Sequence, residues 1–272
     1  MRNDERMMAP NMPSMNQAPQ SGFVYRVPTD IVELPSQGRF YPENHPWHNK
    51  EEVEVRYMTA KEEDILMTPS YIKRGITFER LIESITLDNI DASTLLSGDK
   101  SAIIVNARKN AYGQHYVVDV VCPNCQNKQE TNIDLDEVGI KTPDPELIFN
   151  DRGEVEVELP VSKANVTMKI LTGLDEKQIE KRIQQKVKHG LPEELLLERY
   201  RQIITSVNKS SDIFPINNFI TTMPLRDSKK IQDVYQKLIP DVSYELKHEC
   251  ENCSYVIRGG LPVGPDFFRF DE

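Results

Sequence analysis

The feature that most restricts the fold of this 272-residue chain is the spacing of its four cysteines. They form two CxxC pairs, Cys122 with Cys125 and Cys250 with Cys253. A CxxC turn directs two thiolates to one point, and two such turns complete a tetrahedral site for structural Zn²⁺. Because four thiolates leave no position open for water, catalytic zinc is disfavoured. A rubredoxin-like iron site and a redox-active dithiol pair are the alternatives.

Each cysteine pair lies where a hairpin would turn. The flanking segments alternate or are rich in β-branched residues, as strands are; they are residues 115–121, 129–135, 242–248 and 254–258. Two hairpins that share one metal ion at their turns form a zinc ribbon. The sequence therefore predicts a ribbon assembled from two distant parts of the chain.

The separation of the two pairs predicts a large insertion. Residues 126–249 lie between them, whereas a compact ribbon has roughly 15–20 residues there. The chain must leave the ribbon, build a second structure and return. We therefore expect zinc to hold the 31–121 region, the ribbon and the insertion in one arrangement.

These patterns predict an α+β fold with five parts. Residues 1–21, rich in Met, Pro, Asn and Gln, read as a disordered tail, with a Met-rich docking peptide as the alternative. Residues 22–113 are predicted to be an N-terminal mixed α/β region, and residues 114–136 and 241–260 the zinc ribbon. Residues 137–240 are the insertion, with a β-hairpin at 154–171 and a small helical subdomain at 172–240. Residues 261–272 form a C-terminal tail.

Several local signals place elements within these parts. Val53 and Val55 alternate with charged residues as in a half-buried strand, and a capping box from Thr59 opens a short helix. Further helices are expected at 77–85, 99–112, 175–189, 192–208 and 227–238, with Asp99, Asp175 and Asp227 as N-caps of three of them. Trp47, the only tryptophan, is expected to pack as an anchor.

Two segments are candidate contact regions for a partner protein. The first is a Pro-Ser-Gln-Gly turn with its apolar flanks, and the second is a terminal phenylalanine cluster whose alternative is folding back onto the core. The candidate residues are Leu34, Pro35, Gly38, Phe40 and Tyr41 in the turn, and Phe267, Phe268 and Phe270 in the tail.

Composition and missing motifs favour a binding or assembly protein. The net charge of -10 argues against a protein that grips nucleic acid. No apolar run is long enough to span a bilayer, and no secretion signal is visible, so we expect an intracellular, reducing compartment. The sequence lacks GxxxxGK[ST], GxGxxG, HExxH and GxSxG, so no catalytic residue and no small-molecule substrate are predicted.

Several segments resemble the baseplate hub assembly proteins of T-even-like contractile-tailed phages. They are residues 34–41 (LPSQGRFY), residues 53–66 (VEVRYMTAKEEDIL), residues 71–75 (YIKRG) and the first CPxC turn. The resemblance covers residues 31–125 and does not extend to about 140–240. It implies a non-enzymatic component or catalyst of baseplate hub (central spike) assembly. It also implies hub and tail proteins as partners, in the host bacterial cytoplasm, with the virion baseplate as a second location.

The main alternative is a zinc-ribbon protein that binds nucleic acid or takes part in transcription. That function needs a basic, aromatic face on the ribbon. The ribbon flanks instead carry three basic residues, Lys128, Lys247 and Arg258, against six acidic ones, Asp119, Glu130, Asp134, Glu245, Glu249 and Glu251. A metalloenzyme or redox protein is the third hypothesis.

Overall fold

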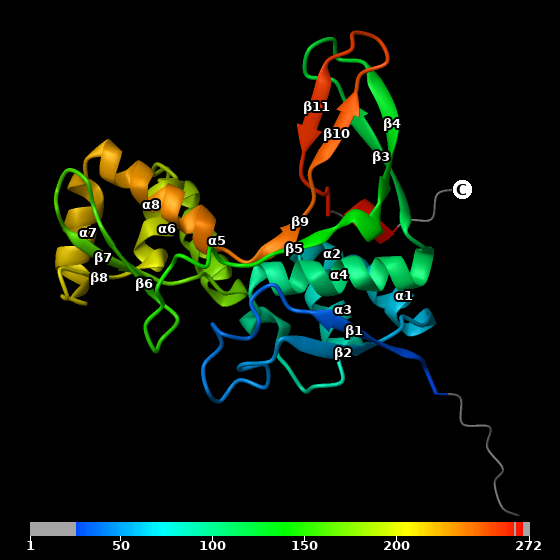
Figure 1. Cartoon of the computed structure of the whole chain (residues 1–272), viewed down its shortest axis with the longest axis horizontal. Helices are drawn as coiled ribbons and strands as arrows, with labels where there is room; N and C mark the ends of the chain where they lie inside the picture. The colour runs from blue at the N-terminus through cyan, green and yellow to red at the C-terminus, as the bar shows by residue number, and fades with distance from the viewer. Residues whose placement is uncertain (1–25, 264, 269–272) are drawn as a thin grey trace, which may run out of the picture.

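The computed structural model describes residues 26–263 and 265–268. The predicted disordered tail at 1–21 and Phe270 lie outside the described residues. Within them the chain is a mixed α/β protein with eight α-helices and five small sheets. Figure 1 shows a helical base, a ribbon that projects from it, and an insertion packed to one side.

The base combines a hairpin with four helices. β1 (Thr29–Glu33) pairs antiparallel with β2 (Glu52–Arg56), whose Val53 and Val55 are buried, as the alternation predicted. The helices are α1 (Ala60–Met67), α2 (Pro69–Arg74), α3 (Thr77–Ile85) and α4 (Ser97–Tyr112), with a 3₁₀ turn, η1 (Ala92–Thr94), before α4. The capping box at the start of α1 is present, and Trp47 is fully buried.

Helix α4 corrects one prediction. It begins at Ser97 with Leu96 at the N-cap position, so Asp99 is not its N-cap. The Asp99 side chain is fully buried and accepts hydrogen bonds from Ser36 and Tyr41 instead. These tertiary partners replace the local backbone donors on which the capping prediction relied.

The ribbon consists of two hairpins that stand side by side (Figure 1). β3 (His115–Val121) pairs with β4 (Lys128–Asp134), and β10 (Leu246–Glu249) pairs with β11 (Val256–Gly259). Both turns, and therefore all four cysteines, lie at the end of the ribbon that is remote from the base. A 3₁₀ turn, η2 (Leu135–Glu137), follows β4.

The insertion has its own connection to the base. β5 (Gly139–Lys141) pairs antiparallel with β9 (Asp241–Ser243), so the chain leaves and re-enters through a two-stranded ladder at the neck. The predicted strand at 242–248 is thus divided between this ladder and β10. The Gly173 N–H also donates to the Leu95 carbonyl (3.0 Å), and Lys177 forms an ion pair with Glu79 (2.6 Å). The insertion is therefore anchored far from the cysteines.

Within the insertion, a three-stranded sheet packs with four helices. The sheet order is β6 (Val155–Glu158), β7 (Asn165–Met168) and β8 (Ile204–Val207). The helices are α5 (Gly173–Lys188), α6 (Leu195–Ile203), α7 (Ile213–Thr222) and α8 (Leu225–Leu238). Within the predicted hairpin at 154–171, residues 155–158 pair antiparallel with residues 165–168, whereas α7 was not predicted.

Three predictions in the insertion were wrong. Asp175 is not the N-cap of α5, which has Thr172 there and uses Asp175 as the third residue of a capping box. The helix expected at 192–208 ends at Ile203, because the β-branched residues that follow pair with β7. Asp227 is not the N-cap of α8, which starts at Leu225. The buried Asp227 carboxylate accepts instead from the N–H groups of Val161 (2.8 Å) and Ser162 (2.9 Å), and so fixes the β6–β7 loop.

Candidate metal centre and contact surfaces

The two CxxC turns have the same backbone conformation. In the first, the Gln126 N–H donates to the Cys122 carbonyl (2.9 Å), and the Cys122 N–H donates to Asn127. The second turn repeats these bonds from Cys250. The residue after each second cysteine has a positive φ, 61° at Gln126 and 54° at Ser254. Non-glycine residues rarely adopt this conformation, so the repeat indicates that both turns present their thiols in the same way.

The geometry of the four thiols fits one tetrahedral metal ion. The Sγ atoms of Cys122 and Cys253 are 3.6 Å apart, as are those of Cys125 and Cys250. All four ligand atoms lie within 4.8 Å of one another. A tetrahedron with Zn–S bonds of about 2.3 Å requires S···S separations of roughly 3.8 Å. The four side chains could thus hold a metal ion without rearrangement.

Neighbouring groups act on the protonation of these thiols in opposite directions. Burial raises the pKa of the Cys122 thiol, whereas a hydrogen bond from the Asn252 side chain lowers the pKa of the Cys125 thiol. The Asn124 amide donates to the Cys253 Sγ at 3.5 Å. N–H donors directed at sulfur stabilise thiolates, which is the form that binds metal.

Gln129 of β4 connects the two turns, and the sequence analysis did not identify it. Its Oε1 atom accepts from the Glu251 N–H (3.2 Å), and its amide nitrogen donates to the Glu249 carbonyl (3.5 Å). A second link joins Thr131 to His248, whose Oγ1 and Nδ1 atoms are 3.0 Å apart. A glutamine within a predicted strand is the one sequence signal, and nothing local specifies its burial or its partner.

The first candidate contact region is mostly buried. Leu34, Pro35, Gly38 and Tyr41 are buried, and Phe40 is half-buried. A Cβ atom on Gly38, which has a φ of 68°, would lie 2.4 Å from backbone atoms of the segment that follows the turn. These residues shape the turn and pack it against the base, so only Phe40 of the five offers a partly accessible side chain.

The second candidate region folds back onto the base. The 3₁₀ turn η3 (Pro265–Phe268) brings Phe267 and Phe268 into the core, where Phe267 is fully buried and packs edge-on against Tyr116. The Arg108 Nε atom donates to the Phe267 carbonyl at 2.7 Å. In this conformation neither phenylalanine is available to a partner, which corresponds to the fold-back alternative.

Comparison with known proteins decides the family. The model of the family described as T4 bacteriophage base plate protein matches residues 28–259. The chain belongs to this family. The match covers the insertion as well as the 31–125 segment on which the resemblance depended, so the T4-like baseplate assignment is confirmed. No curated protein and no solved structure matches the chain.

Membership of the T4 baseplate family indicates a structural role in the phage baseplate, with other tail and baseplate proteins as partners. In the part of the chain that the structure describes, no helix combines the length and apolar character needed to cross a membrane. The same residues contain one cluster of metal-ligand side chains, the four cysteines.

Proposed function

We propose that this T4 baseplate family protein is a non-enzymatic assembly component of the baseplate hub. It binds other hub or central spike subunits in the host bacterial cytoplasm during baseplate morphogenesis. The observation that carries the proposal is the family match over residues 28–259. The resemblance of residues 31–125 to hub assembly proteins supports the hub as the part of the baseplate in which the protein acts.

The ribbon has a structural role in this proposal. The cysteine cluster binds one Zn²⁺, which is saturated by four thiolates and has no position for a substrate. The equal 3.6 Å separations of the two Sγ pairs support this role. The two hairpins then form the zinc ribbon proposed for 114–136 and 241–260. The first part of the second range, β9 (Asp241–Ser243), pairs with β5 in the neck ladder instead of with a ribbon strand.

The nucleic-acid alternative receives no support from the ribbon surface. Two of its three basic residues, Lys247 and Arg258, lie 2.9 Å and 3.7 Å from carboxylate oxygens of Glu245. Cations that already have an acidic neighbour contribute less to the release of counterions from a phosphate backbone. The ribbon is therefore proposed as a scaffold for protein contacts.

Co-expression tests the proposal. The tagged chain is produced with the hub and central spike proteins of the same phage, and in parallel with its baseplate wedge proteins as the matched control. We expect co-purification with at least one hub protein and none of the wedge proteins. Mass spectrometry of purified virions then shows whether the chain stays in the baseplate. Failure to bind any hub protein, or equal binding to wedge proteins, would contradict the hub assignment.

A further inference from the structure

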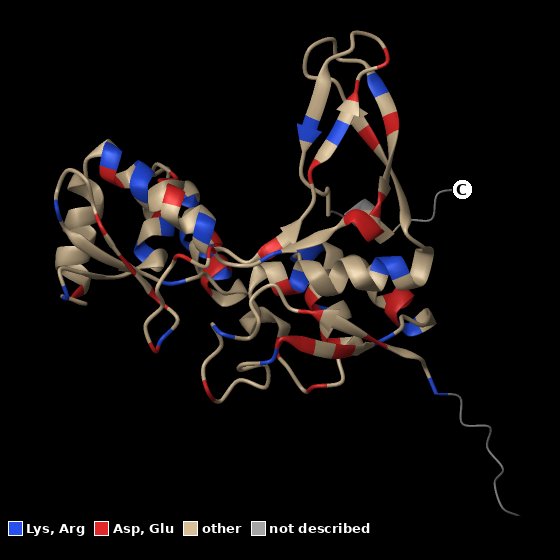
Figure 2. Ribbon diagram, viewed as in Figure 1, with Lys and Arg blue, Asp and Glu red and all other residues tan. Residues whose placement is uncertain are grey.

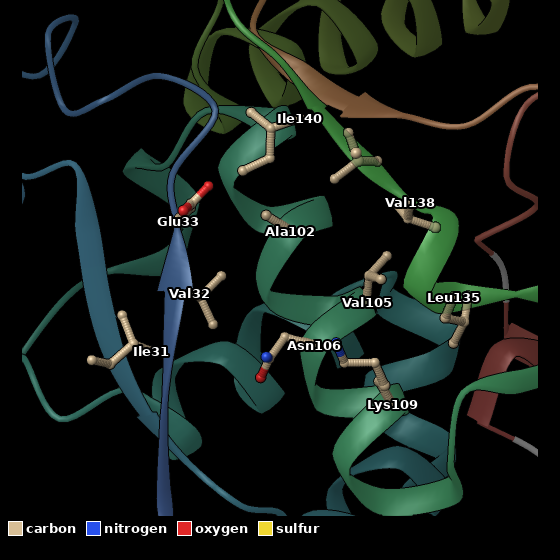
Figure 3. Close-up of a pocket in the computed structure, with 12 residues that line it drawn as sticks. Ile31, Val32, Glu33, Ala102, Val105, Asn106, Lys109, Leu135, Val138 and Ile140 are labelled. Atoms are coloured by element: carbon tan, nitrogen blue, oxygen red, sulfur yellow. The ribbon is translucent and has the colours of Figure 1, made fainter.

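β1 and β5 are both edge strands, and a groove lies between their unpaired edges. β1 pairs with β2 alone and β5 with β9 alone. Helix α4 forms the floor, where Ala102 and Val105 border the same space as Val32 of β1 and Ile140 of β5 (Figure 3). The cavity has a volume of about 140 Å³. A cavity of roughly 150 Å³ can hold benzene, so this one has room for a single apolar side chain.

The hydrogen bonds of β1 show which of its backbone groups are unpaired. The Leu34 N–H donates to Glu51 (2.8 Å), and the Tyr57 N–H donates to Pro28 (2.9 Å). Because paired and unpaired positions alternate in an antiparallel ladder, even-numbered residues of β1 bond to β2. The backbone groups that turn to the free edge are those of residues 29, 31 and 33.

This free edge offers hydrogen bonds to an added strand. The Ile31 N–H is taken by the Asp30 carboxylate (2.9 Å). Within the described residues the structure gives no partner to the Ile31 carbonyl or to the Glu33 N–H. On the far side of the groove, Ile140 of β5 lies opposite Val242 of β9, and the Val242 N–H donates to the Asp241 carboxylate (2.8 Å). The alternation then turns the backbone groups of Ile140 toward the groove.

The β1 side of the groove is acidic. Glu33 and Glu52 lie directly opposite each other, and Glu54 lies opposite Ile31. All three carboxylates are exposed, and none has an ion pair within the described residues; Figure 2 shows this charge on the hairpin. Like charges in directly opposite positions destabilise a strand pair. A positively charged side chain from a binding partner would relieve this repulsion between carboxylates.

The opposite side of the groove does not supply that cation. Lys109 already pairs with Asp136 at 3.1 Å, and the Lys141 Nζ atom donates to the Gln236 carbonyl at 2.7 Å. A second copy of this chain is an unfavourable occupant, because it would bring the same carboxylates to the same edge. The charge therefore selects a basic partner.

We propose that this groove accepts an extended, basic segment of another baseplate protein, which adds as a strand to the free edge of β1. One apolar side chain of the segment fills the cavity over Ala102 and Val105, and a Lys or Arg beside it neutralises Glu33. Main-chain bonds at the edge supply affinity, while the cavity and the charge supply specificity. The inference rests on the proposed assembly role, because it requires a protein partner.

Two pairs of variants separate edge pairing from a general surface effect. Ile31→Pro removes an N–H that bonds to the Asp30 carboxylate and not to β2, and its ring obstructs strand addition. Ile31→Thr also changes the side chain but keeps the N–H, and is the control. Glu33→Lys reverses the charge of this one side chain, and Glu33→Gln removes it. Thermal unfolding of each purified variant checks that it is folded.

The probe is a short synthetic peptide of alternating valine and lysine, with a glutamate version of the same peptide as control. Fluorescence anisotropy should show saturable binding of the lysine peptide to the full chain. Ile31→Pro should weaken this binding by about ten-fold or more, a difference of about 1.4 kcal/mol, and Ile31→Thr should not. Glu33→Lys should weaken the binding of the lysine peptide more than Glu33→Gln does, and should narrow its advantage over the glutamate peptide, because Glu52 and Glu54 remain.

Co-purification with the tail proteins distinguishes the outcomes. Loss of a partner from folded Ile31→Pro, with retention by Ile31→Thr, supports the groove. If Ile31→Pro keeps every partner of the unmodified chain, the groove proposal is wrong and the assembly role stands. If the unmodified chain binds no tail protein, the assembly role itself fails. If the lysine peptide does not bind, the proposal of a basic segment in the groove is wrong. If the chain self-associates and Ile31→Pro dissociates it, the occupant is a second copy of this chain.

Discussion

At the scale of single residues, Asp99 is the centre of the Leu34–Tyr41 turn. Its carboxylate accepts from the Ser36 N–H (3.0 Å), the Ser36 hydroxyl (2.6 Å) and the Tyr41 hydroxyl (2.7 Å). Burial raises the pKa of Asp99, and these hydrogen bonds oppose that rise. The segment that resembles hub assembly proteins is thus held by one buried acid from α4.

Replacement of Asp99 by alanine should destabilise the fold. Asp99→Ala leaves three buried donors without their acceptor, and each such group costs about 1–3 kcal/mol. We expect a loss of roughly 4 kcal/mol in the free energy of unfolding, measured by denaturant titration. Tyr41→Phe removes one of the three bonds and should cost less, about 2 kcal/mol. Equal stability of Asp99→Ala and the unmodified protein would show that the turn is held otherwise.

At the scale of elements, Glu62 joins three segments of the base. It accepts from Arg56 at the end of β2 (2.6 Å), from Ser84 of α3 (2.6 Å) and from Thr59 at the start of α1 (2.7 Å). Burial alone would raise the pKa of Glu62, but these hydrogen bonds outweigh it and lower the pKa to about 2. The charged carboxylate is therefore part of the packed structure.

This shift predicts an acid-sensitive base. A carboxyl group whose pKa is lower in the folded state stabilises the fold above its unfolded pKa, about 4.3, and loses this effect as the pH falls toward 2. Glu62→Gln should cost roughly 3 kcal/mol at neutral pH and should flatten the loss of stability between pH of about 4.3 and 2. Denaturant titrations across this range measure both effects. An unchanged acid profile in Glu62→Gln would assign the sensitivity to other groups.

The ribbon hairpins are the elements that should depend on the proposed Zn²⁺. Cys250→Ser should lower zinc affinity by more than about 100-fold, beyond the effect of losing a hydrogen bond to a ligand. Hydrogen exchange should then rise in β10 and β11 and at the turn after β3. The ladder β5–β9 and the insertion should keep their protection, because they are anchored independently of the cysteines. A chelator should act on the unmodified chain in the same way. Increased exchange throughout the insertion would instead mean that zinc holds the base and the insertion in one arrangement, as the cysteine spacing suggested.

At the scale of the whole molecule, Gly98 controls how the insertion meets the base. A Cβ atom at Gly98 would lie 2.2 Å from the Pro240 carbonyl oxygen, at the start of the neck strand β9. This close approach of α4 to the neck admits no side chain without movement of the backbone. The contact, together with the bonds from Gly173 and Lys177, places the insertion against the base.

Because of this close approach, alanine at position 98 should destabilise the protein, although Gly→Ala usually stabilises a helix. Gly→Ala within a helix usually stabilises by about 1 kcal/mol, but Gly98→Ala should destabilise by roughly 1–3 kcal/mol because it overpacks the neck. Ser101→Ala in the same helix is the control and should be neutral or slightly stabilising. Thermal unfolding compares the two. A higher melting temperature for Gly98→Ala would mean that the neck does not pack against α4.

Local periodicity and spacing are sufficient to predict several elements of this fold. The cysteine hairpins, the half-buried strand at Val53 and Val55, and the helix at 77–85 all follow from repeats within about ten residues. The pairing of two distant CxxC turns could also be anticipated, because one metal needs four ligands. Each of these patterns can be recognised without knowing which other segments the chain will contact.

Features that depend on distant partners could not be predicted in this way and became visible in the folded chain. Asp99 and Asp227 resemble helix caps in the sequence, yet both bind backbone or side chains from other segments. Residues 204–207 continue a helical pattern but join a sheet, because β7 offers them a partner. The neck ladder and the burial of Phe267 depend in the same way on contacts between remote parts of the chain. Local propensity contributes a few tenths of a kcal/mol per residue, and burial or a satisfied polar group contributes several times more, so the distant contact prevails.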